Sequence, residues 1–247
     1  MGRLDGKTAL VTGGNTGIGR EVCVAFAEAG ADVAVNYITR EPEARHLVQA
    51  IEATGRRALA AKADVTQEEE VRAMVQRVLQ SFGHIDILIN NAGVQKAQPI
   101  TEMTVEDWDR MMAVHLRGAF LCCREVVPHM QARGSGKIIN MCSQLAYTGR
   151  ARYAAYAAAK GGLLTFTRAL AQELAPAIQV NAVAPGLVDT GFDPLPESRK
   201  REIAESLPLK RLGRPDDVAP VLVFLASDEA RYFCGQTLGP NGGEVMP

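Results

Sequence analysis

Three side chains in the second half of the chain have the types and spacing for acid-base chemistry. Tyr156 and Lys160 are four residues apart in an alanine-rich stretch without proline, so a helix should present both on one face. Lowering a phenol pKa from ~10 to about 7 requires roughly 4 kcal/mol. One ammonium at about 4 Å supplies on the order of 4 kcal/mol at an effective dielectric of ~20. We therefore predict that Lys160 makes Tyr156 a proton donor near neutral pH, while the Ser143 hydroxyl holds the oxygen that receives the proton.

Tyrosine and lysine at this spacing are also common on exposed helix faces, so the elements that position them matter. Short apolar runs alternate with helical periodicity along the whole chain. The expected strands cover Lys7–Thr12, Asp32–Asn36, Ala58–Lys62, Ile85–Asn90, Lys137–Met141, Gln179–Ala184 and Gln236–Leu238. The expected helices cover the segment after Gly19, then Glu43–Thr54, Glu68–Phe82, Val105–Gln131, Arg152–Leu174 and Asp216–Ala226. This alternation predicts an α/β fold with a parallel sheet of about seven strands and helices on both faces. No linker divides the chain, so we expect one doubly wound Rossmann-type domain, residues 1–247.

Three glycines follow the first expected strand, in the sequence Thr-Gly-Gly-Asn-Thr-Gly-Ile-Gly. Gly13, Gly17 and Gly19 would let the backbone turn tightly and approach a pyrophosphate at the N-terminus of the following helix. The spacing is GxxxGxG rather than the commoner GxGxxG, and a purely structural turn is the alternative. The strand before and the helix after favour dinucleotide binding.

The segment after the second expected strand bears on cofactor choice. A carboxylate there would bind a ribose 2′-hydroxyl, but no carboxylate occurs before Glu41. Arg40 stands beside it, and a guanidinium can pair with a 2′-phosphate. We therefore expect NADP(H) to be preferred over NAD(H), although Glu41 weakens the field of Arg40. After the third strand, Asp64 is placed to accept a hydrogen bond from an adenine amino group. Its alternative role is an N-cap for the next helix, for which Thr66 is better suited.

Composition excludes several other classes of function. The net charge is −1, with 22% charged residues of both signs, which gives no footprint for nucleic acid or an anionic membrane. No apolar run approaches the ~18 residues of a membrane span, and the N-terminal residues lack an apolar signal region. The 5 scattered cysteines suggest no disulfide framework, and the 4 isolated histidines suggest no metal site. We expect a cytoplasmic protein.

Taken together, the motifs resemble those of the short-chain dehydrogenase/reductase family over essentially the whole chain. They are the glycine loop at 12–19, Asn-Asn-Ala-Gly at 90–93, Ser143, Tyr-Ala-Ala-Ala-Lys at 156–160 and Pro-Gly at 185–186. The resemblance implies that Tyr156 exchanges the proton, Ser143 orients the substrate oxygen and Lys160 also binds the nicotinamide ribose. It also implies a homotetramer (or a dimer) in which the helices at 105–131 and 152–174 pair between subunits. The residues expected to bind the cofactor are Gly13, Asn15, Thr16, Gly17, Ile18, Gly19, Tyr37, Arg40, Asp64, Val65, Asn91, Ala92, Gly93, Tyr156, Lys160, Pro185, Gly186, Val188 and Thr190.

The chain departs from the family pattern at His115, where relatives usually carry asparagine. In relatives that asparagine is thought to help hold a water that links the catalytic lysine to solvent. A neutral imidazole also offers one donor and one acceptor, so our hypothesis is that His115 takes part in catalysis and that activity falls as it protonates near pH ~6.5. The alternative is that His115 only fills space in the helix packing. A smaller departure is Asn241, where relatives often have aspartate.

The substrate is left open by the sequence. The overall pattern is most similar to 3-oxoacyl-carrier-protein reductases and glucose 1-dehydrogenase-like enzymes, which implies a small-molecule or acyl-thioester carbonyl substrate. A 3-oxoacyl-thioester reductase is our first hypothesis. The alternatives are a small alcohol or sugar dehydrogenase, or a cofactor-binding protein whose catalysis His115 impairs. Residues 191–209 are expected to form a lid over the substrate, and Arg150 and Arg152 could meet an anionic substrate at the mouth of the site.

Overall fold

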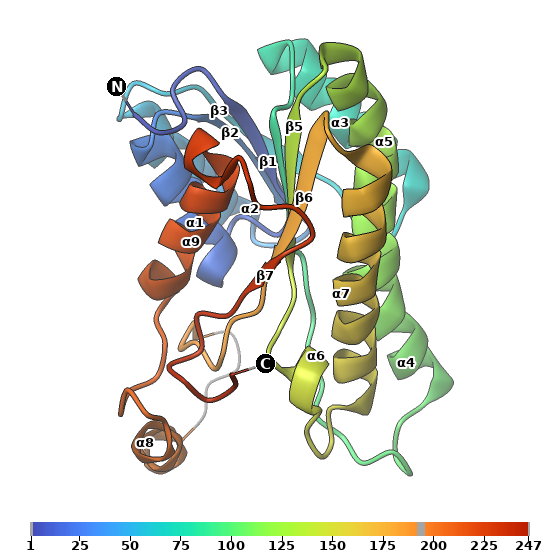
Figure 1. Cartoon of the computed structure of the whole chain (residues 1–247), viewed down its shortest axis with the longest axis vertical. Helices are drawn as coiled ribbons and strands as arrows, with labels where there is room; N and C mark the ends of the chain where they lie inside the picture. The colour runs from blue at the N-terminus through green and yellow to red at the C-terminus, as the bar shows by residue number, and fades with distance from the viewer. Residues whose placement is uncertain (1, 192–195, 247) are drawn as a thin grey trace.

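A seven-stranded parallel sheet forms the centre of the computed structural model, which describes residues 2–191 and 196–246 (Figure 1). The strand order is β3-β2-β1-β4-β5-β6-β7, and every neighbouring pair is parallel. The strands are β1 (Thr8–Val11), β2 (Asp32–Tyr37), β3 (Ala58–Lys62), β4 (Ile87–Asn90), β5 (Gly136–Met141), β6 (Ile178–Val183) and β7 (Thr237–Leu238). The order reverses between β1 and β4, and the loops on both sides of this switch point open toward the same edge. The predicted fold class is confirmed.

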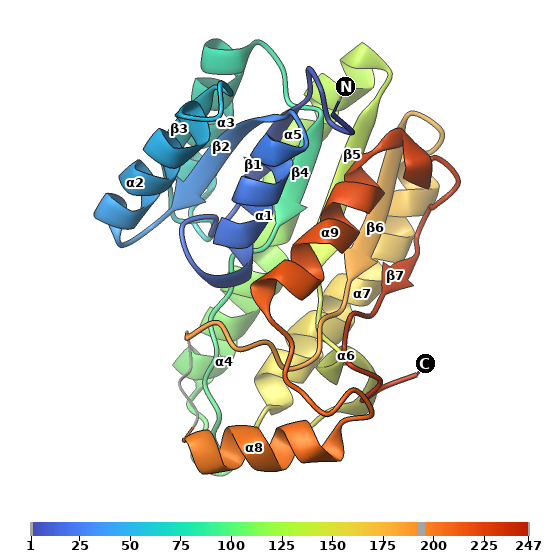
Figure 2. The ribbon, with the colours of Figure 1, turned by 90° about the vertical axis from the view of Figure 1, so that its left-hand side faces the viewer.

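Helices cover both faces of the sheet (Figures 1 and 2). One face carries α1 (Gly17–Glu28), α2 (Glu41–Glu52) and α9 (Pro215–Ala226), and the other carries α3 (Glu68–Phe82), α5 (Gly118–Arg133) and α7 (Ala154–Leu174). Successive strand residues point to opposite faces. In β4, Ile87 and Ile89 pack into the core under α1 and α9, while Leu88 packs into the core under α3 and α5. Burial on both faces explains why the strands read as continuous apolar runs.

The helix predicted over 105–131 is interrupted. It consists of α4 (Val105–Met112), one π-helical turn (Ala113–Arg117) and α5, which continues to Arg133. A π turn carries more residues per turn than an α-helix, and apolar periodicity does not reveal it. Directly after the turn, a Cβ at Gly118 would lie 2.9 Å from the Val65 side chain. The start of α5 therefore packs closely on the loop between β3 and α3. The helix predicted from Arg152 begins instead at Ala154, since Arg152 has a left-handed backbone with φ 72°.

The short α6 (Leu145–Thr148) and the more distant α8 (Glu197–Ser206) lie beyond the carboxyl ends of the strands (Figure 1). Sequence periodicity did not indicate either helix. Part of the predicted lid, residues 192–195, lies outside the described residues. Two contacts hold the described part against the rest of the protein. Lys200 forms an ion pair with Asp189 at 2.8 Å, and the backbone N–H of Leu209 donates a hydrogen bond to the carbonyl oxygen of Gly242. Its role as a lid stays a prediction.

Within the described ranges, no helix has the length and apolar character needed to cross a membrane. Across 2–191 and 196–246, no group of three or more histidine, cysteine, aspartate or glutamate side chains could hold a metal ion. The cysteines are free thiols, and four of them are buried.

Candidate active site

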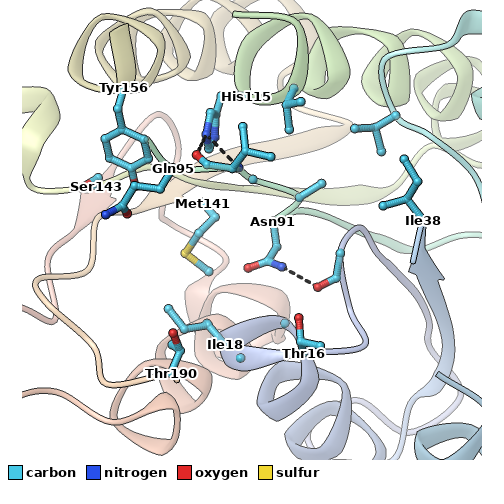
Figure 3. A pocket seen from close by; sticks show the side chains of 18 of the residues that line it. Thr16, Ile18, Ile38, Asn91, Gln95, His115, Met141, Ser143, Tyr156 and Thr190 are labelled. Carbon is cyan, nitrogen blue, oxygen red and sulfur yellow. Dashed lines mark hydrogen bonds between the residues drawn. The ribbon is translucent and has the colours of Figure 1, made fainter. Parts of the chain in front are cut away.

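A cavity of about 630 Å³ lies beyond the carboxyl ends of the strands, with the glycine loop at one side and Ser143 and Tyr156 at the other (Figure 3). All four predicted catalytic residues line it. So do the predicted cofactor-binding residues, except for Tyr37 and Arg40. Residues that the sequence analysis did not select also line it: Asn36, Ile38, Thr39, Ala63, Thr66, Val94, Gln95, Arg110, Ala113, Val114, Met141, Cys142 and Leu187.

The glycine loop has the geometry that a pyrophosphate requires. Gly13 and Gly17 have positive φ angles of 58° and 54°, which side chains adopt only with strain. A Cβ at Gly19 would lie 2.3 Å from the carbonyl oxygen of Gly13. Glycine at position 19 therefore lets the start of α1 pack against the loop, and a tight turn at a helix N-terminus is an arrangement that fits a dinucleotide.

The amides of Asn91 and Asn36 hold this loop in place. Asn91 Nδ2 donates to the carbonyl oxygens of Thr12 and Gly13 at 2.9 and 3.0 Å. Gly13 N donates to Asn36 Oδ1 at 3.1 Å. Asn91, which is among the residues expected to bind the cofactor, thus has its amide nitrogen committed to the glycine loop.

The end of β2 differs in detail from the expectation. Tyr37 is buried, and burial is the main cause that raises the pKa of its phenol. Arg40 is exposed and has a left-handed φ of 58°, so Ile38 and Thr39 form the cavity wall here. Asn15 holds the turn, because its Nδ2 donates to the carbonyl oxygens of Thr39 and Arg40 at 2.9 and 3.2 Å.

Asp64 caps no helix. Its Oδ1 accepts from the backbone N–H and the hydroxyl of Thr66, both at 2.8 Å, which closes a turn before α3. The N-cap of α3 is Gln67, with no side-chain capping bond, so neither Asp64 nor Thr66 plays that part. Asp64 lines the cavity and keeps its second carboxylate oxygen for other contacts.

Tyr156 and Lys160 lie in the first two turns of α7. Lys160 is buried, and its Nζ donates to the carbonyl oxygen of Met141 at 2.5 Å. Burial lowers the pKa of Lys160 to about 8. The pKa of Tyr156 is raised, chiefly by burial, and a hydrogen bond with Ser143 opposes the shift. The net pKa shift of Tyr156 is therefore opposite to the predicted lowering, because in the protein alone desolvation of the phenolate dominates.

His115, on the π-helical turn, is buried against Tyr156 with the ring centroids 5.2 Å apart and the planes at 88°. Its Nε2 lies 2.7 Å from the carbonyl oxygen of Val94. A Cβ at Gly93 would lie 2.8 Å from the imidazole, so glycine is what makes room for it. Burial, with a smaller effect of the Lys160 charge, lowers the pKa of His115 to about 3. The expected protonation near pH ~6.5 is therefore corrected, because the ring stays neutral there.

Comparisons with known proteins agree with this geometry. The family model described as enoyl-(acyl carrier protein) reductase matches residues 13–244. A 3-oxoacyl-[acyl-carrier-protein] reductase of Staphylococcus epidermidis is 40% identical over 242 residues, covering 97% of this chain and 99% of that protein. The chain belongs to the short-chain dehydrogenase/reductase family. It is an oxidoreductase that acts on CH–OH donors, and the family uses NAD or NADP.

Two further relatives of this short-chain dehydrogenase/reductase are informative. The (2S)-[(R)-hydroxy(phenyl)methyl]succinyl-CoA dehydrogenase subunit of Thauera aromatica is 41% identical, with 98% of each chain covered. A short-chain dehydrogenase from Burkholderia cenocepacia J2315, solved in complex with NADP, has a TM-score of 0.92 at 37% identity, with 98% of each chain covered.

In this short-chain dehydrogenase/reductase, the C-terminal segment also supports the site. Glu244 accepts from Gln144 Nε2, and Arg150 donates to its other oxygen at 2.9 Å. Gln144 directly follows Ser143, so this contact braces the loop that carries the serine. Arg150 is thereby paired within the chain, and neither it nor Arg152 lines the cavity. No local sequence signal could have linked residue 244 to residue 144.

Gln95 is one of the lining residues that the sequence analysis did not select. It lines the same cavity as Ser143 and Tyr156 (Figure 3), and its Nε2 is 3.5 Å from the Tyr153 hydroxyl. Its position directly after Asn-Asn-Ala-Gly and Val94 was the only available signal.

Proposed function

We propose that this enzyme reduces a 3-oxoacyl thioester to the hydroxyacyl thioester. The observation that carries the proposal is that Ser143, Tyr156 and Lys160 line one end of a cavity whose other end is a glycine cradle. Two relatives support the choice of substrate, since their names include a 3-oxoacyl carrier-protein reductase and a CoA-thioester dehydrogenase. The bound dinucleotide supplies the hydride, and the chain supplies one proton.

Each catalytic side chain has a distinct part in this proposal. The Ser143 hydroxyl donates a hydrogen bond to the ketone oxygen, and the Tyr156 phenol donates its proton to the same oxygen. A raised phenol pKa keeps Tyr156 protonated at neutral pH, which is the form that a reduction consumes. Lys160, charged below about pH 8, favours the phenolate that remains. A reduction can therefore start from the resting protonation state of Tyr156.

We also propose that NADP(H) is preferred to NAD(H). Arg40 has no ion-pair partner among the described residues, and it stands at the N-terminus of α2 beside the cavity wall. Glu41, the nearest carboxylate in sequence, is neutralised because Arg45 Nε donates to it at 2.8 Å. A 2′-phosphate would therefore meet a free guanidinium rather than a free carboxylate.

The outer face of α5 and α7 is the surface that we propose pairs in a homotetramer or dimer. Phe120 is 42% exposed there, and Leu116 and Phe166 line the same shallow groove of about 900 Å³. Exposed apolar patches of this kind are typical of subunit interfaces.

A substrate panel tests the proposed reaction. Oxidation of NADPH would be followed with 3-oxoacyl-CoA and carrier-protein thioesters, simple ketones and, in reverse, small alcohols and sugars. Turnover of the thioesters with the highest kcat/KM is the expected result. Faster turnover of alcohols or sugars would instead identify a small alcohol or sugar dehydrogenase. NADPH binding without turnover of any member would favour a cofactor-binding protein with lost chemistry.

A further inference from the structure

Gln95 is linked to the catalytic tyrosine by contacts on both sides of the segment that carries it. The ring centroids of His115 and Tyr156 are 5.2 Å apart, and His115 Nε2 lies 3.2 Å from the backbone nitrogen of Val94. The ring centroids of Tyr153 and Tyr156 are 6.5 Å apart, and the Tyr153 hydroxyl lies 3.5 Å from Gln95 Nε2. Val94 and Gln95 are thus each joined to Tyr156 through one ring, and both line the cavity (Figure 3).

The loop that follows Gln95 is fixed by its own hydrogen bonds. The backbone N–H of Gln98 donates to the carbonyl oxygen of Arg152 at 2.8 Å, which ties this loop to the turn before α7. Gln98 is buried, and its Nε2 donates to Asp107 on α4 at 3.1 Å. Lys96 donates to the same carboxylate oxygen at 2.5 Å. The loop is therefore a fixed support for the Gln95 side chain.

The polar side chains near Tyr156 can bind different parts of a substrate. In the proposed reaction, the hydroxyls of Ser143 and Tyr156 bind the ketone oxygen. Lys160 donates to the carbonyl oxygen of Met141, which holds the ammonium at the end of β5. Gln95 adds a primary amide to the same cavity, and an amide nitrogen carries two N–H donors. A second acceptor on the substrate could therefore bind Gln95 while the two hydroxyls bind the first.

We propose that Gln95 determines specificity by donating a hydrogen bond to the thioester carbonyl oxygen of the substrate. This role rests on the proposed function, because a 3-oxoacyl thioester carries a second carbonyl one CH₂ away from the ketone and a simple ketone does not. The 3.5 Å contact of Gln95 Nε2 with the Tyr153 hydroxyl is longer than an ordinary N–H···O bond of about 2.9–3.0 Å. A carbonyl oxygen at the ordinary distance is therefore the better acceptor for this amide.

A pair of matched substrates tests this role in the full chain. One is a 3-oxoacyl thioester of N-acetylcysteamine, and the other is the thioether in which CH₂ replaces the thioester carbonyl. The two ketones differ in intrinsic reactivity, but that difference is the same for every variant. The measured quantity is therefore the ratio of kcat/KM for the thioester to kcat/KM for the thioether, with NADPH as the reductant.

Two substitutions remove the amide donor in different ways. Gln95→Met keeps the length of the side chain without its polar atoms, and Gln95→Glu replaces the amide with a carboxylate that can only accept. We expect the ratio to fall at least ~5-fold in both variants, which corresponds to the loss of one neutral hydrogen bond. A merely structural role would lower both kcat/KM values together and leave the ratio unchanged. Both variants should fold, because Gln95 is exposed in the protein alone.

Gln98→Met is the matched control on the same loop. It removes a buried amide that bonds Asp107 and does not line the cavity, so its ratio should equal that of the parent. An unchanged ratio in either Gln95 variant, or an equal fall in Gln98→Met, would overturn the role of Gln95. If the parent reduces the thioester and the Gln95 variants keep its preference, the proposed function stands and only this role is lost. A parent that does not reduce the thioester would overturn both.

Discussion

Lys160 donates to the carbonyl oxygen of Met141 at 2.5 Å, and its Nζ lies 5.7 Å from the centroid of the Tyr156 ring. The ammonium is thus anchored to the end of β5. Burial of the phenol outweighs the effect of the ammonium on the pKa of Tyr156, so the phenol stays protonated.

Removal of the Tyr156 proton donor should abolish most turnover. In Tyr156→Phe the ring stays but the hydroxyl is lost, so we expect turnover to fall by at least ~10²-fold. The dissociation constant for NADPH should change little. Steady-state kinetics and fluorescence titration measure the two effects, and Tyr232→Phe, a change at a 98% exposed side chain, is the control. Full activity of Tyr156→Phe would show that another group donates the proton.

The buried charge of Lys160 should lower the free energy of unfolding at neutral pH. Its folded pKa of about 8 lies below the ordinary 10.5, so the unfolded chain binds more protons between these values. The destabilisation is fully present below about pH 8 and is relieved as pH rises toward about 10.5. We expect Lys160→Met to be inactive but more stable at pH 7 by on the order of 1–3 kcal/mol, after the loss of the Met141 bond. Urea unfolding from about pH 7 to 10 tests this, with exposed Lys62→Met as control. A variant less stable than the parent would contradict it.

His115 should affect stability in acid rather than the rate near neutrality. Its folded pKa of about 3 lies below the ordinary 6.5, so the neutral ring stabilises the fold above about pH 6.5. The free energy of unfolding therefore falls by about 1.4 kcal/mol for each pH unit below 6.5, until the pH approaches 3. His115→Asn should therefore lose less stability than the parent between about pH 6 and 4. The acid limbs of the two pH–rate profiles should coincide above about pH 5, and a limb shifted by the substitution would restore the hypothesis of an ionising His115.

Arg40 should determine the preference between cofactors. Arg40→Ala removes the unpaired guanidinium, and a charge-assisted hydrogen bond contributes about 1.5–3 kcal/mol. The affinity for NADPH should fall at least ~10-fold, while the affinity for NADH stays nearly constant. Side-by-side titrations of the variant and of the exposed control Arg231→Ala provide the measurement. Equal losses for both cofactors would place the 2′-phosphate elsewhere.

Glu244 should matter although it lies far from Ser143 in sequence. Glu244→Ala leaves the buried Gln144 amide without its acceptor, which costs about 1–3 kcal/mol. We expect a lower melting temperature and a lower kcat/KM, because the Ser143 loop loses its brace. Glu229→Ala, which breaks only an exposed ion pair with Arg3, is the matched control. Equal melting temperatures and equal kcat/KM values for the two variants would show that Glu244 does not support the site.

The sequence by itself determined the parallel sheet, the glycine cradle and the pairing of Tyr156 with Lys160. These features follow from local rules: apolar runs between helices predict buried parallel strands, and residues four apart share a helix face. The π turn at Ala113–Arg117 was not predictable, since it changes the helix by about one residue within an unbroken apolar pattern.

Only the tertiary structure decided the direction of the pKa shifts and the partners of the polar side chains. Burial raises the pKa of Tyr156 and keeps His115 neutral, and burial depends on how α7, the π turn and β5 pack together. The contact of Glu244 with Gln144 joins residues that are distant in sequence. So do the hydrogen bonds from Asn140 Nδ2 to Thr167 Oγ1 and from Asn90 Nδ2 to Asn140 Oδ1. Desolvation and hydrogen bonding act through space, so spacing along the chain could place the chemical groups but not determine their protonation.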